Sequence, residues 1–357
     1  MPQLPSEPKE FFRGKRCLVT GHTGFKGFWL SVWLDLLGAE VAGLSFDPGG
    51  SARLYTEGRS GVRFSREFSA DLRNAAETAA AVRELQPEIV FHLAAQPLVR
   101  VSYRDPLLTW STNVMGTANL LDACAQSGGV AAVVVVTTDK VYENREDGRA
   151  YRESDRLGGR DPYSASKAAT ELLCSSWRES FSTSGGFRLA TARAGNVIGG
   201  GDWAGDRLVP DAIRAFSAGL PLVLRNPLST RPWQHVLDPL CGYLLLASAM
   251  DGVEGDRAAR PWNFGPADGE SATVEQVARE VARLWGGGKV EIEASGLHPH
   301  EAALLRLDAC SASSALGWSP QWDLAESLRH TVEWYRRTSA GEDPVVLMRE
   351  QIGKYPL

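Results

Sequence analysis

The stretch RCLVTGHTGFKG, residues 16–27, joins a short apolar run to three glycines. The run predicts a buried strand, and FWLSVWLDLLG at 28–38 predicts a helix. Gly21, Gly24 and Gly27 then lie between strand and helix, where glycine permits a tight turn and a close approach of backbone N–H groups to a pyrophosphate. The stretch therefore predicts a dinucleotide-binding fold.

Further apolar runs alternate with helical patterns along the first half of the chain. EVAGLSFD at 40–47, EIVFHLAA at 88–95 and AAVVVVTT at 131–138 are predicted strands, and 108–126 is a predicted helix between the last two. Nearly continuous apolar runs are typical of parallel strands that helices cover on both faces. The alternation predicts an α/β fold, a Rossmann-type doubly wound parallel sheet. His92, inside one such run, is interpreted as a core histidine.

The regular alternation loosens past about residue 195, where glycine-rich and proline-rich segments appear. We expect residues 11–190 to form the NAD-binding Rossmann domain, with a return segment at about 233–264. Residues 195–232 and 266–340 are expected to form a smaller C-terminal substrate-binding lobe, built from excursions off the sheet.

Composition and charge exclude several functions. The 357 residues carry a net charge of −5, which argues against general nucleic-acid binding. No apolar run reaches the roughly 18–20 residues that a membrane span needs, and the first residues lack the apolar core of a secretion signal. The five cysteines form no CxxC pair. We expect a soluble, cytoplasmic protein that binds no metal, nucleic acid or membrane.

Asp47 indicates which dinucleotide binds. It lies 20 residues past Gly27, at the end of the second strand, where a carboxylate can accept hydrogen bonds from the adenosine ribose and repel a 2′-phosphate. The sequence therefore predicts NAD as the cofactor. Arg53, close by in sequence, weakens the preference over NADP.

Other residues join the predicted cofactor site by position. His22, Phe25 and Lys26 belong to the glycine loop, and for His22 and Lys26 contact with the cofactor phosphates and simple solvation are both open. Asp71 and Leu72 follow a third apparent strand. Asp71 either caps the next helix or contacts adenine.

Tyr163 and Lys167 in DPYSASKAATELL stand four residues apart and share one helix face. A phenol is a poor base at neutral pH, but a neighbouring ammonium favours the phenolate and permits hydride chemistry at an alcohol. Thr138, at the end of the preceding strand, can hydrogen-bond the same substrate oxygen. The three residues predict a Thr/Tyr/Lys catalytic set.

Several motifs together resemble a known family. TGHTGFKG, TTDK, YSASK, RAGNVIGGGDW, RPWQHV and HPHEA resemble the extended short-chain dehydrogenase/reductase family, and within it the nucleotide-sugar 4,6-dehydratase branch. The likeness covers nearly the whole chain. The glycine loop and the Tyr–Lys pair are shared by many activities, whereas the other motifs are narrower.

The resemblance implies a reaction on a nucleotide-diphosphate hexose. Hydride leaves C4, water is eliminated across C5–C6, and hydride returns to C6, giving a 4-keto-6-deoxy sugar. Tyr163 would deprotonate the C4 hydroxyl, with Lys167 lowering its pKa and Thr138 orienting O4. Asp139 and Lys140 would serve as the acid and base of the elimination. A surface ion pair is the simpler interpretation of these two residues.

Lys140 bears on the substrate. The dTDP-glucose dehydratases carry an Asp-Glu pair at this place, and the chain resembles the CDP-glucose enzymes in having lysine. Moving one proton from the Lys140 ammonium to the Asp139 carboxylate turns the ion pair of these two residues into a neutral acid and a neutral amine. A site that excludes water could therefore reach this neutral state without taking up a proton from solvent. The resemblance implies CDP-glucose as the substrate, and dTDP-glucose, GDP-mannose or a UDP-sugar is the alternative.

The resemblance also implies substrate-binding residues and an assembly. Arginine is suited to a pyrophosphate because its fork binds phosphate oxygens. The expected substrate residues are Gln96, Asn196, Arg207, Arg225, Arg231, His300 and Glu301. A homodimer or homotetramer is expected, paired through helices at about 105–126 and 163–180.

Two other functions stay open. A 4-epimerase would share the fold and cofactor but would not need the Asp139–Lys140 pair. A cofactor-sensing regulator would keep the fold without chemistry, although such proteins usually lose the Tyr–Lys pair that this chain retains.

Overall fold

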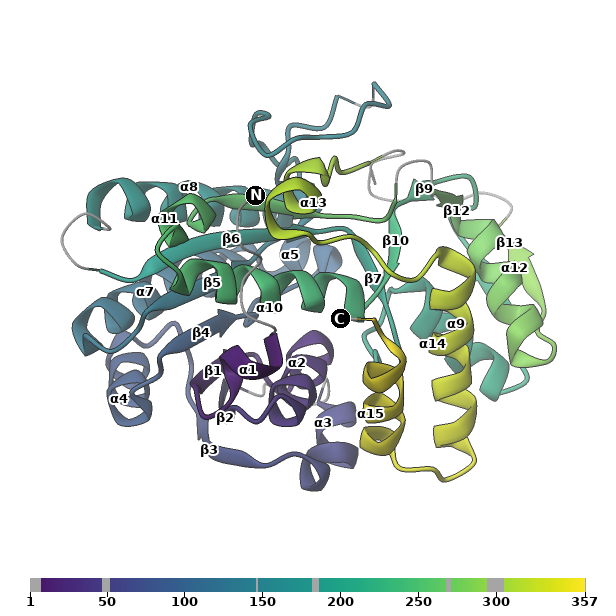
Figure 1. Ribbon diagram of the computed structural model, residues 1–357. Coiled ribbons are helices and arrows are strands. Elements are labelled where there is room, and N and C mark those ends of the chain that lie inside the picture. Colours follow the sequence, from purple (N-terminus) through teal and green to yellow (C-terminus); the bar gives the residue numbers. More distant parts are fainter. Residues whose placement is uncertain are drawn as a thin grey trace.

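The computed structural model describes residues 8–46, 52–145, 147–181, 186–267, 271–293 and 305–356. Its centre is a parallel sheet of seven strands in the order β11-β6-β5-β4-β1-β2-β3 (Figure 1). The strands are β1 Arg16–Thr20, β2 Glu40–Ser45, β3 Phe64–Ser69, β4 Ile89–His92, β5 Ala132–Val136, β6 Arg188–Ala194 and β11 Pro261–Phe264. The strand order reverses between β1 and β4, the point where doubly wound sheets bind ligands. The predicted doubly wound α/β fold is confirmed.

The valine run of β5 explains why helices cover both faces of the sheet. Successive side chains of a strand point to opposite faces. Val133 and Val135 accordingly join one buried cluster with Leu120 of α7, whereas Val134 and Val136 join the other cluster. Each face therefore removes apolar area from water, worth about 25 cal/mol per Å².

The helices that cover the sheet alternate with its strands along the chain. The longer ones are α2 Phe25–Leu36, α4 Ala75–Leu85, α7 Gly116–Ser127, α8 Pro162–Phe181 and α10 Leu237–Asp251. Short helices also occur: α1 Pro8–Phe12, α3 Arg53–Gly58, α5 Val99–Arg104, α6 Pro106–Trp110, α11 Gly255–Ala258 and the single turns η1 Arg59–Gly61 and η3 Asp139–Val141.

The helix predicted at 108–126 contains a π turn. After α6, residues Ser111–Met115 form the π-helical turn η2, and α7 continues from Gly116. Asn113 lies in this turn and donates a hydrogen bond to the carbonyl of Gln96 (3.1 Å) and another to Ser166 of α8 (2.9 Å). Such bulges are frequent at functional sites, and this one ties the loop after β4 to α8.

Short strands and two helices gather to one side of the sheet, to the right in Figure 1. The elements are α9 Leu208–Ser217, α12 Val274–Trp285 and the strands β7 Asn196–Ile198, β8 Leu222–Leu224, β9 Thr230–Arg231, β10 Trp233–His235, β12 Ala272–Thr273 and β13 Val290–Ile292. They pair two by two, β7 with β10, β9 with β12 and β8 with β13. The exact domain boundaries given above stay a prediction.

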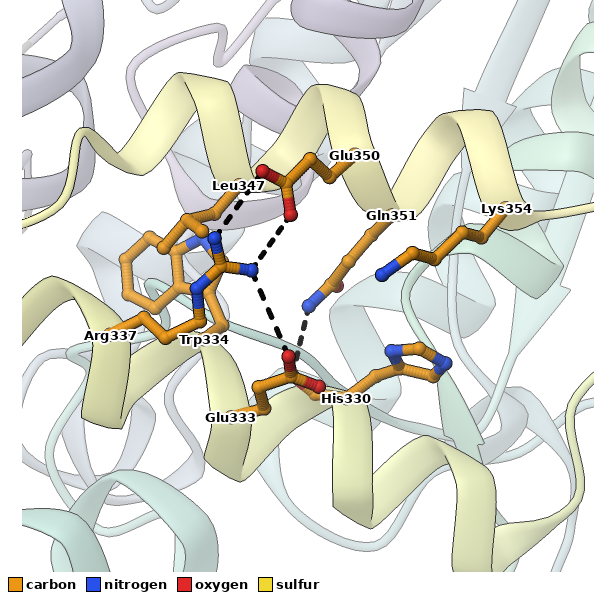
Figure 2. Close-up of a pocket in the computed structure, with 8 residues that line it drawn as sticks. All are labelled: His330, Glu333, Trp334, Arg337, Leu347, Glu350, Gln351 and Lys354. Atoms are coloured by element: carbon orange, nitrogen blue, oxygen red, sulfur yellow. Dashed lines mark hydrogen bonds and ion pairs between the residues drawn. The ribbon is translucent and has the colours of Figure 1, made fainter.

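The chain ends in α13 Cys310–Leu316, α14 Leu324–Ser339 and α15 Pro344–Lys354. Figure 2 shows Arg337 of α14 reaching Glu350 of α15, with an Nη1–Oε2 distance of 2.7 Å. Gln351 of α15 donates to the carbonyl of His330, 2.9 Å away. In none of the described ranges is a helix long and apolar enough to cross a bilayer.

Candidate active site

The glycine loop between β1 and α2 has no room for side chains at two of its positions. Gly21 has a φ of +73°, and a Cβ atom there would lie 2.7 Å from the backbone nitrogen of Ala94. A Cβ at Gly27 would lie 2.1 Å from the carbonyl oxygen of Gly21. Gly24 precedes α2 and provides no side-chain cap to it. The helix N-terminus is therefore open to an anion, and the loop fits the phosphates of a dinucleotide.

His22 is buried, and Phe25 is half-buried. His22 is 2% exposed, and its ring nitrogens lie 2.9 Å from Ser45 Oγ and 3.2 Å from Glu67 Oε1. Burial lowers the pKa of His22, although Glu67 opposes it. Solvation is therefore the wrong interpretation for this side chain. The ring of Phe25 packs beside Gly199, where a Cβ would lie 3.0 Å from Cζ.

Lys26 lies near several of the residues predicted to be catalytic. Its ammonium donates a hydrogen bond to the hydroxyl of Tyr243 on α10, 2.7 Å away. Burial lowers the pKa of Lys26 to about 7, and the positive charges of Arg207 and Lys167 lower it further. Lys26 is therefore near enough to both Arg207 and Lys167 to feel their charges.

The capping interpretation of Asp71 is wrong. Asn74 caps α4 by accepting two backbone N–H groups, whereas Asp71 pairs with Arg73 (2.9 Å, Nε–Oδ2). The hydrogen bonds from Arg73 lower the pKa of Asp71. Leu72 is buried, at 5% exposed. Three further predicted residues lie outside the described part of the chain: Asp47, His300 and Glu301.

The polar end of β5 is buried. Thr138 caps η3 and is 7% exposed, and Asp139 is 3% exposed. The Thr138 hydroxyl donates to Asp139 Oδ1, 2.9 Å away. Burial raises the pKa of Asp139, against the opposing effects of Lys140, Thr138 and Arg231. The interpretation of Asp139 and Lys140 as a surface ion pair is therefore wrong. Burial shifts Asp139 toward its protonated form.

Tyr163 and Lys167 lie on one face of α8, beside this strand end. Tyr163 is 8% exposed, and burial raises its pKa to about 12, although a hydrogen bond with Thr138 opposes the rise. The ammonium of Lys167 donates to the carbonyl of Val136 (3.0 Å), and burial lowers its pKa to about 8. The predicted Thr/Tyr/Lys set is thus in one place, and Tyr163 needs a nearby positive charge to act as a base.

A buried ion pair lies close to Tyr163 and Lys167, and no motif in the sequence indicated it. Glu171 stands four residues beyond Lys167 on α8 and binds Arg193 of β6 through Nη2 (2.8 Å) and Nε (3.0 Å). Thr137 and Thr191 also donate to its carboxylate. Burial works to raise the pKa of Glu171, but Arg193 and these donors lower it. A Glu and an Arg on separate elements carry no recognisable spacing, so only tertiary structure reveals them.

Arg207 lies beside the catalytic tyrosine. Its Nη1 binds Asp202 Oδ2 at 2.8 Å, and the charge of Asp202 raises the pKa of Arg207. The charge of Arg207 in turn lowers the pKa of Tyr163. The predicted phosphate-binding arginine therefore lies within electrostatic reach of the predicted base.

The other predicted substrate residues have different surroundings. Arg231 lies on β9 near Asp139, whose pKa its charge lowers. Arg225 binds Asp206 at 3.2 Å, and Asn196 is half-buried at the start of β7. The side chain of Gln96 accepts a hydrogen bond from the backbone N–H of Leu98 in its own loop (2.7 Å) and donates one to Thr109 of α6 (2.9 Å).

His92 is a core histidine, as predicted. It is 2% exposed, and its two ring nitrogens lie 2.7 Å from Thr20 Oγ1 and 2.9 Å from Thr117 Oγ1. Burial lowers its pKa to about 3, so the ring is neutral at pH 7.

Comparison with known proteins identifies the family. Residues 17–262 match the model of the NAD dependent epimerase/dehydratase family. The chain is 45% identical to the CDP-glucose 4,6-dehydratase of Salmonella typhimurium, over 97% of this chain and 98% of that protein. It is 32% identical to a dTDP-glucose 4,6-dehydratase of Streptomyces griseus, over 72% and 74% of the two chains. The protein belongs to the NAD dependent epimerase/dehydratase family, whose description names the predicted cofactor.

Solved structures agree with this assignment. The UDP-glucose 4-epimerase of Thermus thermophilus in complex with NAD superposes with a TM-score of 0.77 at 30% identity, covering 90% of this chain and 98% of that one. A dTDP-glucose 4,6-dehydratase double mutant from Streptomyces venezuelae with NAD bound gives 0.77 at 27% identity, covering 92% and 99%. The fold and its glycine loop are therefore those of NAD-binding relatives.

Proposed function

We propose that the protein is an NAD-dependent nucleotide-sugar 4,6-dehydratase that converts CDP-glucose to CDP-4-keto-6-deoxyglucose. The observation that carries this proposal is the buried Asp139 beside Thr138 and Tyr163. Oxidation at C4 needs only the Thr/Tyr/Lys set, whereas elimination needs a further proton donor held in the same cavity. The likeness to the Salmonella CDP-glucose 4,6-dehydratase supports the choice of sugar nucleotide.

The chain would hold NAD at the glycine loop, with its phosphates at the N-terminus of α2 and its nicotinamide end toward Tyr163 and Lys167. When bound, NAD supplies an acceptor for the hydride of C4 and returns that hydride to C6. Tyr163 takes the proton of the C4 hydroxyl, while Thr138 holds O4. Lys167 and Lys26 provide the positive charge that a buried phenolate requires.

Elimination then removes the C5 proton and the C6 hydroxyl. Asp139 donates a proton to the departing hydroxyl, which leaves as water, and Lys140 accepts the proton from C5. The raised pKa of Asp139 supports its role as the acid. When hydride reaches C6, C5 regains a proton, so the sugar loses one water overall and the cofactor is unchanged.

The surroundings of Tyr163 and Asp139 offer the substrate phosphates a set of cations. Arg207 and Arg231 affect the pKa values of Tyr163 and Asp139, respectively, so both would lie within reach of a sugar nucleotide. We propose that they bind the diphosphate, together with Arg225.

The protein is further proposed to act in the cytoplasm as a homodimer or homotetramer. Four large apolar side chains are exposed on α6, the adjoining π turn and α8: Leu107 (79%), Trp110 (39%), Met115 (56%) and Leu172 (60%). A second copy would cover this area. Sedimentation of a monomer at micromolar concentration would contradict the assembly.

The test is incubation with CDP-glucose, dTDP-glucose, GDP-mannose and UDP-glucose separately, followed by the absorbance of the 4-keto product in base. We expect turnover with CDP-glucose and no need for added reductant. A 4-epimerase would release no 4-keto-6-deoxy product. If only another sugar nucleotide is converted, the proposed dehydratase activity stands and the proposed cytidine nucleotide is wrong.

Lys140→Met separates the two halves of the reaction. We expect NADH absorbance to appear, because C4 oxidation does not use Lys140, while release of the 4-keto-6-deoxy product stops. Tyr163→Phe is the matched control and should show neither. Unchanged product formation by Lys140→Met would remove Lys140 from the mechanism.

A further inference from the structure

One carboxylate at the edge of the active site is shared by two arginines from different parts of the fold. Asp206 Oδ1 lies 3.2 Å from Nη1 of Arg100 and 3.2 Å from Nη2 of Arg225. Arg100 belongs to α5, which follows β4 of the central sheet, and Arg225 follows β8. Two guanidinium groups on one oxygen form a site for an anion, and Asp206 occupies it.

Asp206 reaches this position in a backbone conformation that few residues adopt. Its φ is +59°, the left-handed region, in which Asp and Asn are tolerated better than other side chains. The segment before it is fixed, because Asp202 is 4% exposed, binds Arg207, and accepts a hydrogen bond at its carbonyl from Tyr335 of α14. Asp206 itself is about half exposed, with 47% of its side chain in solvent.

Arg207, the residue after Asp206, relates this anion site to the residues predicted to be catalytic. Arg207 follows directly and its charge reaches Tyr163. Arg225 follows β8, and Arg100 lies on α5, shortly after the loop that contains Gln96. A sugar whose C4 hydroxyl contacts Tyr163 would direct its C1 phosphates toward arginines at this edge.

We propose that Asp206 occupies the site of the substrate's diphosphate in the free protein, and that the diphosphate displaces it and binds Arg100 and Arg225. Arg100 is then a substrate-binding residue supplied by the central domain. The inference rests on the proposed function, since it assumes a nucleotide-diphosphate substrate.

Charge favours the exchange. A diphosphate carries two negative charges and several acceptor oxygens, so it can satisfy two guanidinium forks, whereas Asp206 offers both arginines a single oxygen. Asp206 is already partly solvated while it binds the arginines, so its release into solvent costs little free energy. The apparent affinity for the diphosphate is then the intrinsic affinity multiplied by the fraction of molecules in which Asp206 does not occupy the arginines.

The opposite role for Asp206 is a brace that holds Arg100 and Arg225 in place. The two roles predict opposite signs when the charge of Asp206 is removed. Without a competitor the diphosphate binds more tightly, and without a brace it binds more weakly. Asp206→Asn is the suitable change, because Asn keeps the shape and tolerates the left-handed backbone.

The experiment is calorimetric titration of the NAD-loaded protein with CDP and with cytidine at low ionic strength, where exposed charges are least screened. For Asp206→Asn we expect about three- to tenfold tighter binding of CDP, the range set by two partly exposed ion pairs, and unchanged binding of cytidine. For Arg100→Ala we expect about tenfold weaker binding of CDP only. That loss should be larger in the Asp206→Asn background.

Arg104→Ala is the matched control, since it removes the same charge from the exposed end of the same helix. It should leave CDP binding unchanged. Weaker CDP binding by Asp206→Asn, or an equal effect of Arg100→Ala on CDP and cytidine, would overturn the exchange. If the protein binds a different nucleoside diphosphate, that diphosphate and its nucleoside replace CDP and cytidine in the titrations. An error in the proposed nucleobase therefore does not affect the outcome. Binding of no nucleoside diphosphate would overturn it.

Discussion

Two buried polar clusters lie on either side of the sheet and are stabilised in opposite ways. The catalytic support cluster consists of Glu171, Arg193, Thr137, Thr191 and Tyr142, and its carboxylate accepts from Arg193 and both threonines. The C-terminal polar cluster lies under α14 and α15 and consists of Asp238, His235, His330, Gln234 and Tyr355. Within the described residues, its buried atoms Asp238 Oδ2, His235 Nε2, His330 Nδ1 and Gln234 Oε1 have no hydrogen-bond partner.

The difference shows that hydrogen-bond donors, not burial alone, decide the charge of a buried acid. Glu171 is 1% exposed, yet Arg193 and its other donors keep its pKa low. Asp238 is fully buried, and burial raises its pKa to about 6, although Gln321 and Tyr355 donate to it. The first cluster therefore holds an ionised carboxylate on α8, the helix that carries Tyr163 and Lys167, and the second contains an acid whose pKa lies near neutrality.

The largest effect is expected when the catalytic support cluster loses one charge. Glu171→Ala leaves Arg193 buried and unpaired, so we expect the free energy of unfolding to fall by about 3–5 kcal/mol in urea titrations. The double variant Glu171→Leu/Arg193→Met is the control and should lose less, because it leaves no isolated charge. If the double variant is as unstable as Glu171→Ala, the unpaired charge of Arg193 is not the cause of the lost stability.

Asp238→Asn should change how stability depends on pH. The folded-state pKa of Asp238 is about 6 against an ordinary 3.8, so ionisation of this acid weakens the fold as pH rises from 4 to 6. Asparagine does not ionise. The stability of Asp238→Asn relative to the natural chain should therefore increase over that range, by at most about 3 kcal/mol, and level off above it. A pH-independent difference between the two would contradict the raised pKa.

A smaller effect is expected from Tyr355→Phe. The Tyr355 hydroxyl donates to Asp238 Oδ1, 2.7 Å away, while its ring packs against Trp33 and Trp322. Phenylalanine keeps the ring, so we expect a loss of about 1–2 kcal/mol from the missing hydrogen bond. The loss should be larger at pH 8 than at pH 5, because the ionised carboxylate depends more on its donor. An equal loss of unfolding free energy at both pH values would show that the contribution of the Tyr355 hydroxyl does not depend on the ionisation of Asp238.

The smallest effect belongs to the exposed ion pairs above the C-terminal cluster. Arg337 binds Glu342 and Glu350 at the surface. Because solvent and salt screen such pairs, Arg337→Gln should leave the Tm nearly unchanged in thermal denaturation at physiological salt. A large drop would mean that α15 is held by its surface charges and not by the buried contacts of Tyr355.

The sequence predicted the sheet better than it predicted side-chain partners. Apolar runs and glycine spacing identified β1, β2, β4 and β5, because burial on both faces imposes a local pattern. Capping was less predictable, since Asp71 and Asn74 are both suitable types and only the helix start at Ala75 selects Asn74. The side chain of Gln96 similarly has partners that its position did not indicate, the backbone N–H of Leu98 and Thr109 of α6.

By itself, the sequence determined the glycine loop, the Thr138–Lys140 strand end and the Tyr163–Lys167 pair, because each depends on neighbours in the chain. The tertiary structure decided what lies across from them: Tyr243 beside Lys26, Arg193 beside Glu171, and Arg100 with Arg225 on Asp206. These contacts join residues from separate elements, and no spacing in a single chain encodes them. Charge and hydrogen bonding at such contacts set the pKa values, so the chemistry of the site depends on the fold as a whole.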